Sequence, residues 1–208
     1  MAGGRATRFD FTKVKTKVRE KALLKLGSKY FIEHILEAAR SAINIDQIYV
    51  AVSPFTPKTR DFLMKIPERV EICDTPGNGY HEDLVSAVKH LKLGVVLTTG
   101  TDIPLIRNTQ LDHIINQYWA CKKPALAVMS PLPQFQKQGL SATMILHYPE
   151  YKENVVPLGI NVIDGNLIDY PELDQAIYVI EEDETLLFNI NTIEDYNVLI
   201  AKYGSRRA

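Results

Sequence analysis

Residues 47–57 read QIYVAVSPFTP, an apolar β-branched run that passes into a turn and then into a helix start. The run predicts a strand to Val52, and the Thr-Pro pair after it predicts a helix N-cap with a proline in the first turn. Residues 70–73 predict the next strand, which is followed by the glycine turn of DTPGNGYHEDL and a helical pattern to about His90. This alternation predicts an α/β fold, a Rossmann-like, mostly parallel sheet with flanking helices.

The rest of the chain continues the alternation on both sides of this centre. Further strands are expected at 94–98, 125–129, 158–163 and 185–188, and further helices at 30–42, 111–120 and 192–204, the last capped by Thr192. Between 130 and 157 prolines, glutamines and aromatic residues follow one another irregularly, which predicts a hairpin or lid. With 208 residues, the chain is expected to form a single domain over 1–208.

Composition excludes several classes of function. The net charge is −1 and the pI is about 6.5, so nucleic acid is not expected as the main partner. The sequence has no apolar run near the roughly 20 residues of a membrane span, and its first residues lack the apolar core of a signal peptide. Cys73 and Cys121 have no metal-type spacing and suit a reducing compartment. We therefore expect a cytoplasmic protein with no membrane partner, and the oligomeric state stays open.

The first group of polar residues is MAGGRATR at 1–8, followed after a basic loop by a Glu-Lys pair. Two glycines allow backbone N–H groups to surround a phosphate, and Arg5, Arg8 and Lys21 supply positive charge for a triphosphate. A flexible chain start would contain the same glycines. The basic residues of the loop are either a solvated face or a patch that attracts a polyanion, and they are Lys13, Lys15, Lys17, Arg19, Lys21 and Lys25.

This joint pattern resembles the nucleotidyltransferases, the family of sugar-nucleotide pyrophosphorylases and of guanylyltransferases in the molybdenum cofactor and cobalamin pathways. In that family a first strand leads into A-G-G-x-G-T-R-M, and E-K-P follows. Ala6, Phe9 and Ala22 stand where the family has glycine, methionine and proline. The resemblance implies that Arg8 and Lys21 are catalytic and that the nucleotide is bound by Gly3, Gly4, Arg5, Ala6 and Thr7.

The resemblance also bears on the sheet. The family's first strand precedes the position of Ala2, so we expect a nucleotidyltransferase fold whose first strand is missing from this chain. Either that strand lies upstream of Met1 or this form lacks it. The missing strand, together with Ala6 and Ala22, motivates one alternative function, a nucleotide-binding protein without turnover.

The second group of polar residues lies in the glycine turn at 74–84. A glycine turn between a strand and a helix is often only a turn, but at the carboxyl end of a parallel strand it is also where α/β sheets bind ligands. In the resembling family the base is bound here, which implies nucleotide contacts by Gly77, Asn78, Gly79, Tyr80 and Asp83. The runs AVSPFTPKTRDF and DTPGNGYHEDL resemble most the archaeal enzymes that transfer GMP to adenosylcobinamide phosphate.

Three further stretches of the sequence contain candidate site residues. Asp102 follows an apolar strand, and it either caps the turn before a proline or holds magnesium against the nucleotide phosphates. Asn191 precedes the last helix and is a second candidate magnesium ligand. PLGINVID places Gly159 and Asn161 beside a strand, where the resemblance implies nucleotide contacts. The five histidines show no metal-type spacing.

The resemblance therefore implies a guanylyltransferase that uses magnesium, GTP and a phosphate-bearing corrinoid acceptor. The acceptor phosphate of adenosylcobinamide phosphate would attack the α-phosphorus of GTP and release pyrophosphate, giving adenosylcobinamide-GDP. The segment 130–157 is then expected on the acceptor side. Another acceptor, molybdopterin or a sugar phosphate, is the alternative within the same enzyme class.

Overall fold

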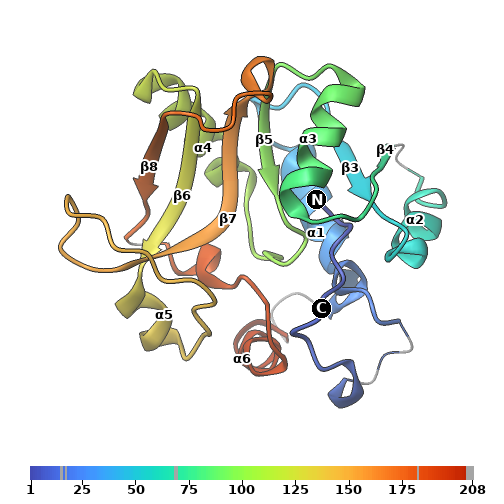
Figure 1. The fold of residues 1–208 in the computed structure, drawn as a ribbon. Helices are drawn as coiled ribbons and strands as arrows, with labels where there is room; N and C mark the ends of the chain where they lie inside the picture. The colour runs from blue at the N-terminus through green and yellow to red at the C-terminus, as the bar shows by residue number, and fades with distance from the viewer. Residues whose placement is uncertain (15, 17, 68–69, 182, 205–208) are drawn as a thin grey trace.

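The computed structural model describes residues 1–208 apart from 15, 17, 68–69, 182 and 205–208 (Figure 1). Lys15 and Lys17 of the predicted basic loop lie outside the described residues. The strands are β1 Lys25–Leu26, β2 Lys29–Tyr30, β3 Tyr49–Val52, β4 Glu71–Asp74, β5 Val95–Thr99, β6 Ala125–Pro131, β7 Val155–Asp164 and β8 Gln175–Val179. The helices are α1 Phe31–Arg40, α2 Pro57–Leu63, α3 Tyr80–Leu91, α4 Asn108–Cys121, α5 Leu132–Gln138 and α6 Ile193–Tyr203.

The sheet is mixed and has two hydrogen-bonded parts. The larger part has the order β5-β7-β6-β8, in which β7 runs antiparallel to β5 and to β6 while β8 is parallel to β6. The smaller part is the parallel pair β3-β4. Figure 1 places the two parts side by side, with β3 next to β5 and the amino terminus between them. The expected α/β class is confirmed, and the antiparallel β7 makes the sheet mixed.

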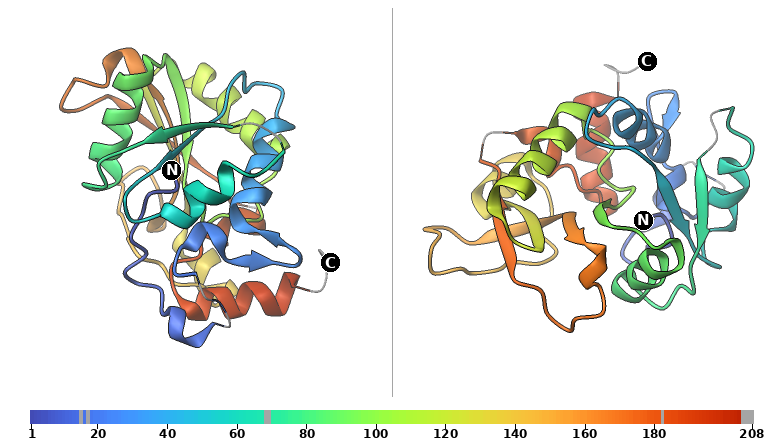
Figure 2. Two further views of the ribbon diagram at one scale, coloured as in Figure 1. Left: turned by 90° about the vertical axis from the view of Figure 1, so that its right-hand side faces the viewer. Right: turned by 90° about the horizontal axis from the view of Figure 1, so that it is seen from above.

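Helices cover both faces of the sheet. Seen from above, α3 lies on one face and α1 and α4 lie on the other (Figure 2). The apolar periodicity of 30–42 produces α1, which buries Phe31, Ile35 and Ala38 in the main core. β6 is buried along its whole length because helices or loops cover both of its faces. Among the described residues, no helix combines the length and apolar character that a bilayer crossing requires.

Most expected elements are present, but the strand predicted at 185–188 is wrong. Residues Glu184–Leu187 form a 3-10 turn, because the Asp183 carboxylate accepts hydrogen bonds from the Thr185 amide at 3.0 Å and hydroxyl at 2.7 Å. The sequence analysis also missed β8, although its AIYV run has β-branched and aromatic residues.

The segment 130–157 also differs from the expected hairpin. Part of it is helical, since α5 follows β6 directly and ends at Gly139, whose φ of +70° is the left-handed conformation of a helix C-cap. A single bridge between Leu146 and Val155 gives the remainder its hairpin character. Its role as an acceptor lid stays a prediction.

Candidate active site

A cleft of about 670 Å³ opens where the chain start, the glycine turn after β4 and the loop after β5 come together. These segments meet because β3, β4 and β5 all end at this edge of the sheet, so the loops that follow them are neighbours. The predicted site residues that line the cleft are Gly3, Gly4, Arg5, Ala6, Thr7, Arg8, Lys21, Gly77, Asn78, Gly79, Tyr80, Asp83, Asp102 and Asn191.

The amino-terminal loop is fixed against the turn after β3. The Ser53 hydroxyl donates a 2.7 Å hydrogen bond to the Gly3 carbonyl, and a Cβ at Gly3 would lie 3.0 Å from that of Ser53. Gly3 therefore allows a close approach that a larger residue would hinder. Ala6 has a φ of +51°, the left-handed conformation that favours glycine, and the Phe9 amide donates to its carbonyl at 3.0 Å. The loop keeps its turn although this position lacks the family's glycine.

Lys21, Asp102 and Asn191 form the charged centre of the cleft. The Lys21 ammonium donates to Asp102 Oδ2 at 2.8 Å, to the Ile190 carbonyl at 2.9 Å and to Asn191 Oδ1 at 3.3 Å. The side chains of Lys21 and Asp102 are 17% and 21% exposed, so this ion pair is partly shielded from water. Arg8 joins the group through a 3.4 Å hydrogen bond to Asn191 Oδ1. Residues far apart in sequence thus place positive charge and oxygen atoms at one point.

The glycine turn forms the opposite side of the cleft. The buried carboxylate of Asp83 accepts from the amides of Gly77 at 2.8 Å and Asn78 at 3.3 Å, which holds the turn on the start of α3. Gly77 has a φ of +80°. Tyr80 Oη lies 3.0 Å from Thr98 Oγ1, and burial raises the pKa of the Tyr80 phenol above its ordinary value. Asp83 therefore stabilises the glycine turn in this structure, because its Oδ1 accepts hydrogen bonds from two backbone amides of that turn.

Gly159 and Asn161 are not among the described residues that line the cleft. Gly159 lies in β7 with a φ of +73°, where the pairing with β6 shifts register, so its glycine suits a β-bulge. Asn161 pairs in register with Thr98, whose hydroxyl oxygen lies 3.0 Å from Tyr80 Oη. Their assigned nucleotide contacts stay a prediction, and the geometry gives both residues a supporting place behind the cleft.

Sequence reasoning missed the function of Glu20. Its buried carboxylate accepts from the amides of Lys58 at 2.9 Å and Thr59 at 2.7 Å, at the start of α2. Thr56, the expected N-cap, makes no side-chain cap bond, and its hydroxyl bonds instead with the Ser53 backbone. Glu20 therefore caps α2 from a distance and places Lys21 in the cleft. The adjacent Glu-Lys pair was the only signal in the sequence.

The amino group of Met1 is a second group that the sequence did not reveal. It donates a 2.8 Å hydrogen bond to the Thr99 carbonyl at the end of β5. Burial lowers the pKa of this amine from 8.0 to about 6, and the negative charge of Asp102 offsets part of that effect. The charge of the Met1 amine therefore interacts with Asp102 inside the cleft.

Comparison with known proteins agrees with this geometry. Residues 1–149 match the MobA-like NTP transferase domain. The chain belongs to this nucleotidyltransferase family. Among curated proteins, the transferase is 22% identical over 205 residues to the probable molybdenum cofactor guanylyltransferases of two Clostridium perfringens strains, strain 13 and strain ATCC 13124. The match covers 97% of this chain and 94% of each relative.

Solved structures share the fold of the transferase. A CMP:2-keto-3-deoxy-manno-octonic acid synthetase complexed with CTP superposes with a TM-score of 0.66 at 12% identity, over 91% of this chain and 95% of that one. The bifunctional IspDF of Campylobacter jejuni gives a TM-score of 0.65 at 16% identity, over 95% of this chain and 52% of that one. These likenesses establish the nucleotidyltransferase fold.

Proposed function

We propose that the transferase moves GMP from GTP to a phosphate-bearing acceptor and releases pyrophosphate. The observation that carries this proposal is the meeting of Lys21, Asp102 and Asn191 beside the glycine turn of the cleft. Support for the guanylyl group comes from the relatives named as guanylyltransferases and from the resemblance of the runs around β3 and β4. GTP is therefore the proposed donor.

Transfer of GMP to a phosphate requires positive charge near the reacting phosphates more than it requires a general base. A phosphate monoester is largely ionised near neutral pH, so one of its oxygens can attack the α-phosphorus of GTP without a general base. The bond from the α-phosphorus to the oxygen bridging the β-phosphate breaks, and pyrophosphate carries that electron pair away. Lys21 and Arg8 reach the cleft as fixed cations, and Arg5 stands at its rim with its guanidinium 3.9 Å from the Phe55 ring centroid. These cations would stabilise the developing charge.

Magnesium is the proposed metal, and the residues present fit it. Asp102 Oδ2, Asn191 Oδ1 and the Ile190 carbonyl converge on the Lys21 ammonium within 3.3 Å, so three oxygen atoms already face one small region. Oxygen donors of this kind are those that magnesium prefers. Asp102 and Asn191 would hold the ion, which when bound neutralises charge on the nucleotide phosphates. Lys21 would then balance the phosphates from the same side.

For the acceptor we propose adenosylcobinamide phosphate, a phosphate-bearing corrinoid. The support is the likeness of AVSPFTPKTRDF and DTPGNGYHEDL to the archaeal enzymes of that reaction. Molybdopterin is the second candidate, favoured by the Clostridium perfringens relatives. We also propose that the segment 130–157 binds the acceptor. Its sequence resembles the family least, and a pocket for a particular acceptor would be expected where the sequence differs from the family.

The test measures pyrophosphate release by purified protein with magnesium and each donor and acceptor pair. We expect release with GTP and adenosylcobinamide phosphate, and little with ATP. Pyrophosphate release only with molybdopterin would identify molybdopterin as the acceptor instead. If the protein binds GTP but releases no pyrophosphate with any acceptor, a nucleotide-binding protein without turnover is favoured.

A variant pair tests the charged centre. Asp102→Asn keeps the side-chain volume but removes the charge, so turnover should fall by at least a hundredfold while the fold survives. The control is Asp174→Asn, whose exposed carboxylate pairs with Lys123 outside the cleft and should leave the rate unchanged. An active Asp102 variant with ordinary magnesium dependence would remove this residue from the mechanism.

A further inference from the structure

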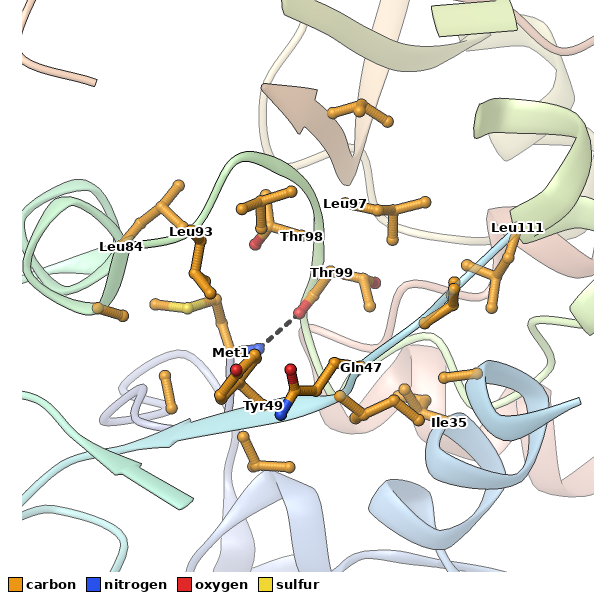
Figure 3. Close-up of a pocket in the computed structure, with 18 of the residues that line it drawn as sticks. Met1, Ile35, Gln47, Tyr49, Leu84, Leu93, Leu97, Thr98, Thr99 and Leu111 are labelled. Atoms are coloured by element: carbon orange, nitrogen blue, oxygen red, sulfur yellow. Dashed lines mark hydrogen bonds between the residues drawn. The ribbon is translucent and has the colours of Figure 1, made fainter. Parts of the chain in front are cut away.

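A second cavity, of about 570 Å³, lies between β3 and β5 and adjoins the active-site cleft. Figure 3 shows that aliphatic side chains point into it, among them Ile35 of α1 and Leu84 of α3. Gly100 and Thr101 line both the cavity and the cleft, directly before Asp102. The charged centre of the cleft therefore has apolar surroundings on one side, where its charges are weakly screened.

The oxygen atoms that converge in the cleft are held in place by bonds that do not involve the lysine side chain. The Ile190 amide donates to the Asp102 carbonyl at 2.8 Å, which joins the segment before α6 to the loop after β5. The Asn191 side-chain nitrogen donates to Asn189 Oδ1 at 3.2 Å and to the Asn189 carbonyl at 3.3 Å, which turns Asn191 Oδ1 toward the cleft. These oxygen atoms would keep their places if the lysine ammonium moved away.

The Lys21 ammonium uses all of its hydrogen-bonding capacity on these oxygen atoms. Asp102 Oδ1 lies against Gly100, in the space that a side chain at that position would fill, and Asp102 Oδ2 accepts from the Lys21 ammonium at 2.8 Å. The same ammonium donates to the Ile190 carbonyl and to Asn191 Oδ1. Since an ammonium group has three donors, no donor remains for another acceptor while these bonds are intact.

A divalent cation and the ammonium would compete for the same oxygen atoms. Magnesium binds oxygen at about 2.0–2.1 Å, so an ion on Asp102 Oδ2 would lie no farther than about 5 Å from the Lys21 nitrogen, which is 2.8 Å from that oxygen. The side chains of this ion pair are partly shielded from water, so the repulsion between the two cations would be weakly screened. Binding of the metal therefore requires the lysine to leave.

We infer that the Lys21 ammonium occupies the metal position in the nucleotide-free protein and keeps divalent cations out of it. This inference rests on the magnesium site of the proposed function. Nucleotide phosphates supply new acceptors for the ammonium, so their arrival would draw Lys21 away and free Asp102 Oδ2 and Asn191 Oδ1 for the metal. Metal and nucleotide would then each increase the affinity of the protein for the other.

The experiment measures Mn²⁺ binding to the nucleotide-free protein from the loss of the electron paramagnetic resonance signal of the free ion. Mn²⁺ is the probe because it takes the same oxygen ligands as magnesium. Lys21→Met removes the positive charge, and Lys21→Gln removes the charge but keeps an amide that can donate to Asp102. We expect both variants to bind Mn²⁺ at least tenfold more tightly than the parent protein, with circular dichroism verifying that each variant is folded.

Two control variants locate the effect. Lys123→Met removes an ammonium that is also 2.8 Å from a carboxylate, that of Asp174, but lies outside the cleft, so the Mn²⁺ affinity should not change. Combining Asp102→Asn with Lys21→Met should abolish the gain in affinity. A gain that persists without the Asp102 carboxylate, or that Lys123→Met reproduces, would overturn the inference.

The result for Lys21 is separate from the result for the proposed activity, because Mn²⁺ binding requires no turnover. An unchanged Mn²⁺ affinity in both Lys21 variants would overturn the inference even if the parent protein releases pyrophosphate from GTP. A tenfold gain that depends on Asp102, in a protein that releases no pyrophosphate with any donor or acceptor, would support the inference and contradict only the proposed activity.

Discussion

Acetylation of the Met1 amine should make the protein more stable at acidic pH. The folded protein lowers the pKa of this amine to about 6 from 8.0, so between these values the unfolded chain binds more protons than the folded one. The free energy of unfolding therefore rises with pH through this window. The free-energy cost of burying the protonated amine is fully present below pH 6. Two pH units at about 1.36 kcal/mol each correspond to roughly 2–3 kcal/mol. An acetyl amide cannot titrate but can still donate to Thr99, and the cavity beside it has room for the group.

Urea unfolding of the acetylated and free forms at pH 5.5, 7 and 8.5 measures this effect. Intact mass must first verify that Met1 is retained in both proteins. All other titrating groups are common to both forms, so their contributions cancel in the difference between the two pH profiles. We expect the acetylated form to gain most at pH 5.5 and least at pH 8.5. Profiles that stay parallel across this range would refute the assignment of a lowered amine pKa.

Three substitutions test the supports of the cleft. Glu20→Gln should cost about 1–3 kcal/mol of unfolding free energy, because an amide cannot accept all the bonds that the carboxylate takes from α2, including the Thr59 amide; urea unfolding within 0.5 kcal/mol of the parent would contradict this. Gly77→Ala should weaken GTP binding, measured by calorimetry, by tenfold or more. The φ of +80° disfavours alanine, and the added Cβ would lie 2.7 Å from the Phe55 ring. An unchanged affinity would show that the turn does not position the base. Ala6→Gly should raise stability by about 0.5–1 kcal/mol, as relief of left-handed strain exceeds the added backbone entropy; a lower melting temperature would contradict it.

The elements that the sequence predicted correctly are those with local causes. The helix capped by Thr192 forms as expected, because the cap and the first-turn acid, Asp195, accept hydrogen bonds from one another's backbone amides within one turn. The glycine turn at 77–79 likewise depends on backbone freedom that can be read from residue type. The strand predicted at 185–188 failed because Asp183 offers the backbone a competing hydrogen bond.

The sequence by itself determined the α/β class, the order of most elements and the residue types of the cleft, because periodicity, caps and glycine turns act over a few residues. Only the tertiary structure decided which distant groups meet. Lys21 lies 81 positions from Asp102, and Glu20 caps a helix 38 positions away, contacts that depend on how the chain crosses the sheet. The same is true of the gap between β3 and β5, because strand edges become neighbours only when helices on both faces fix the spacing of the sheet.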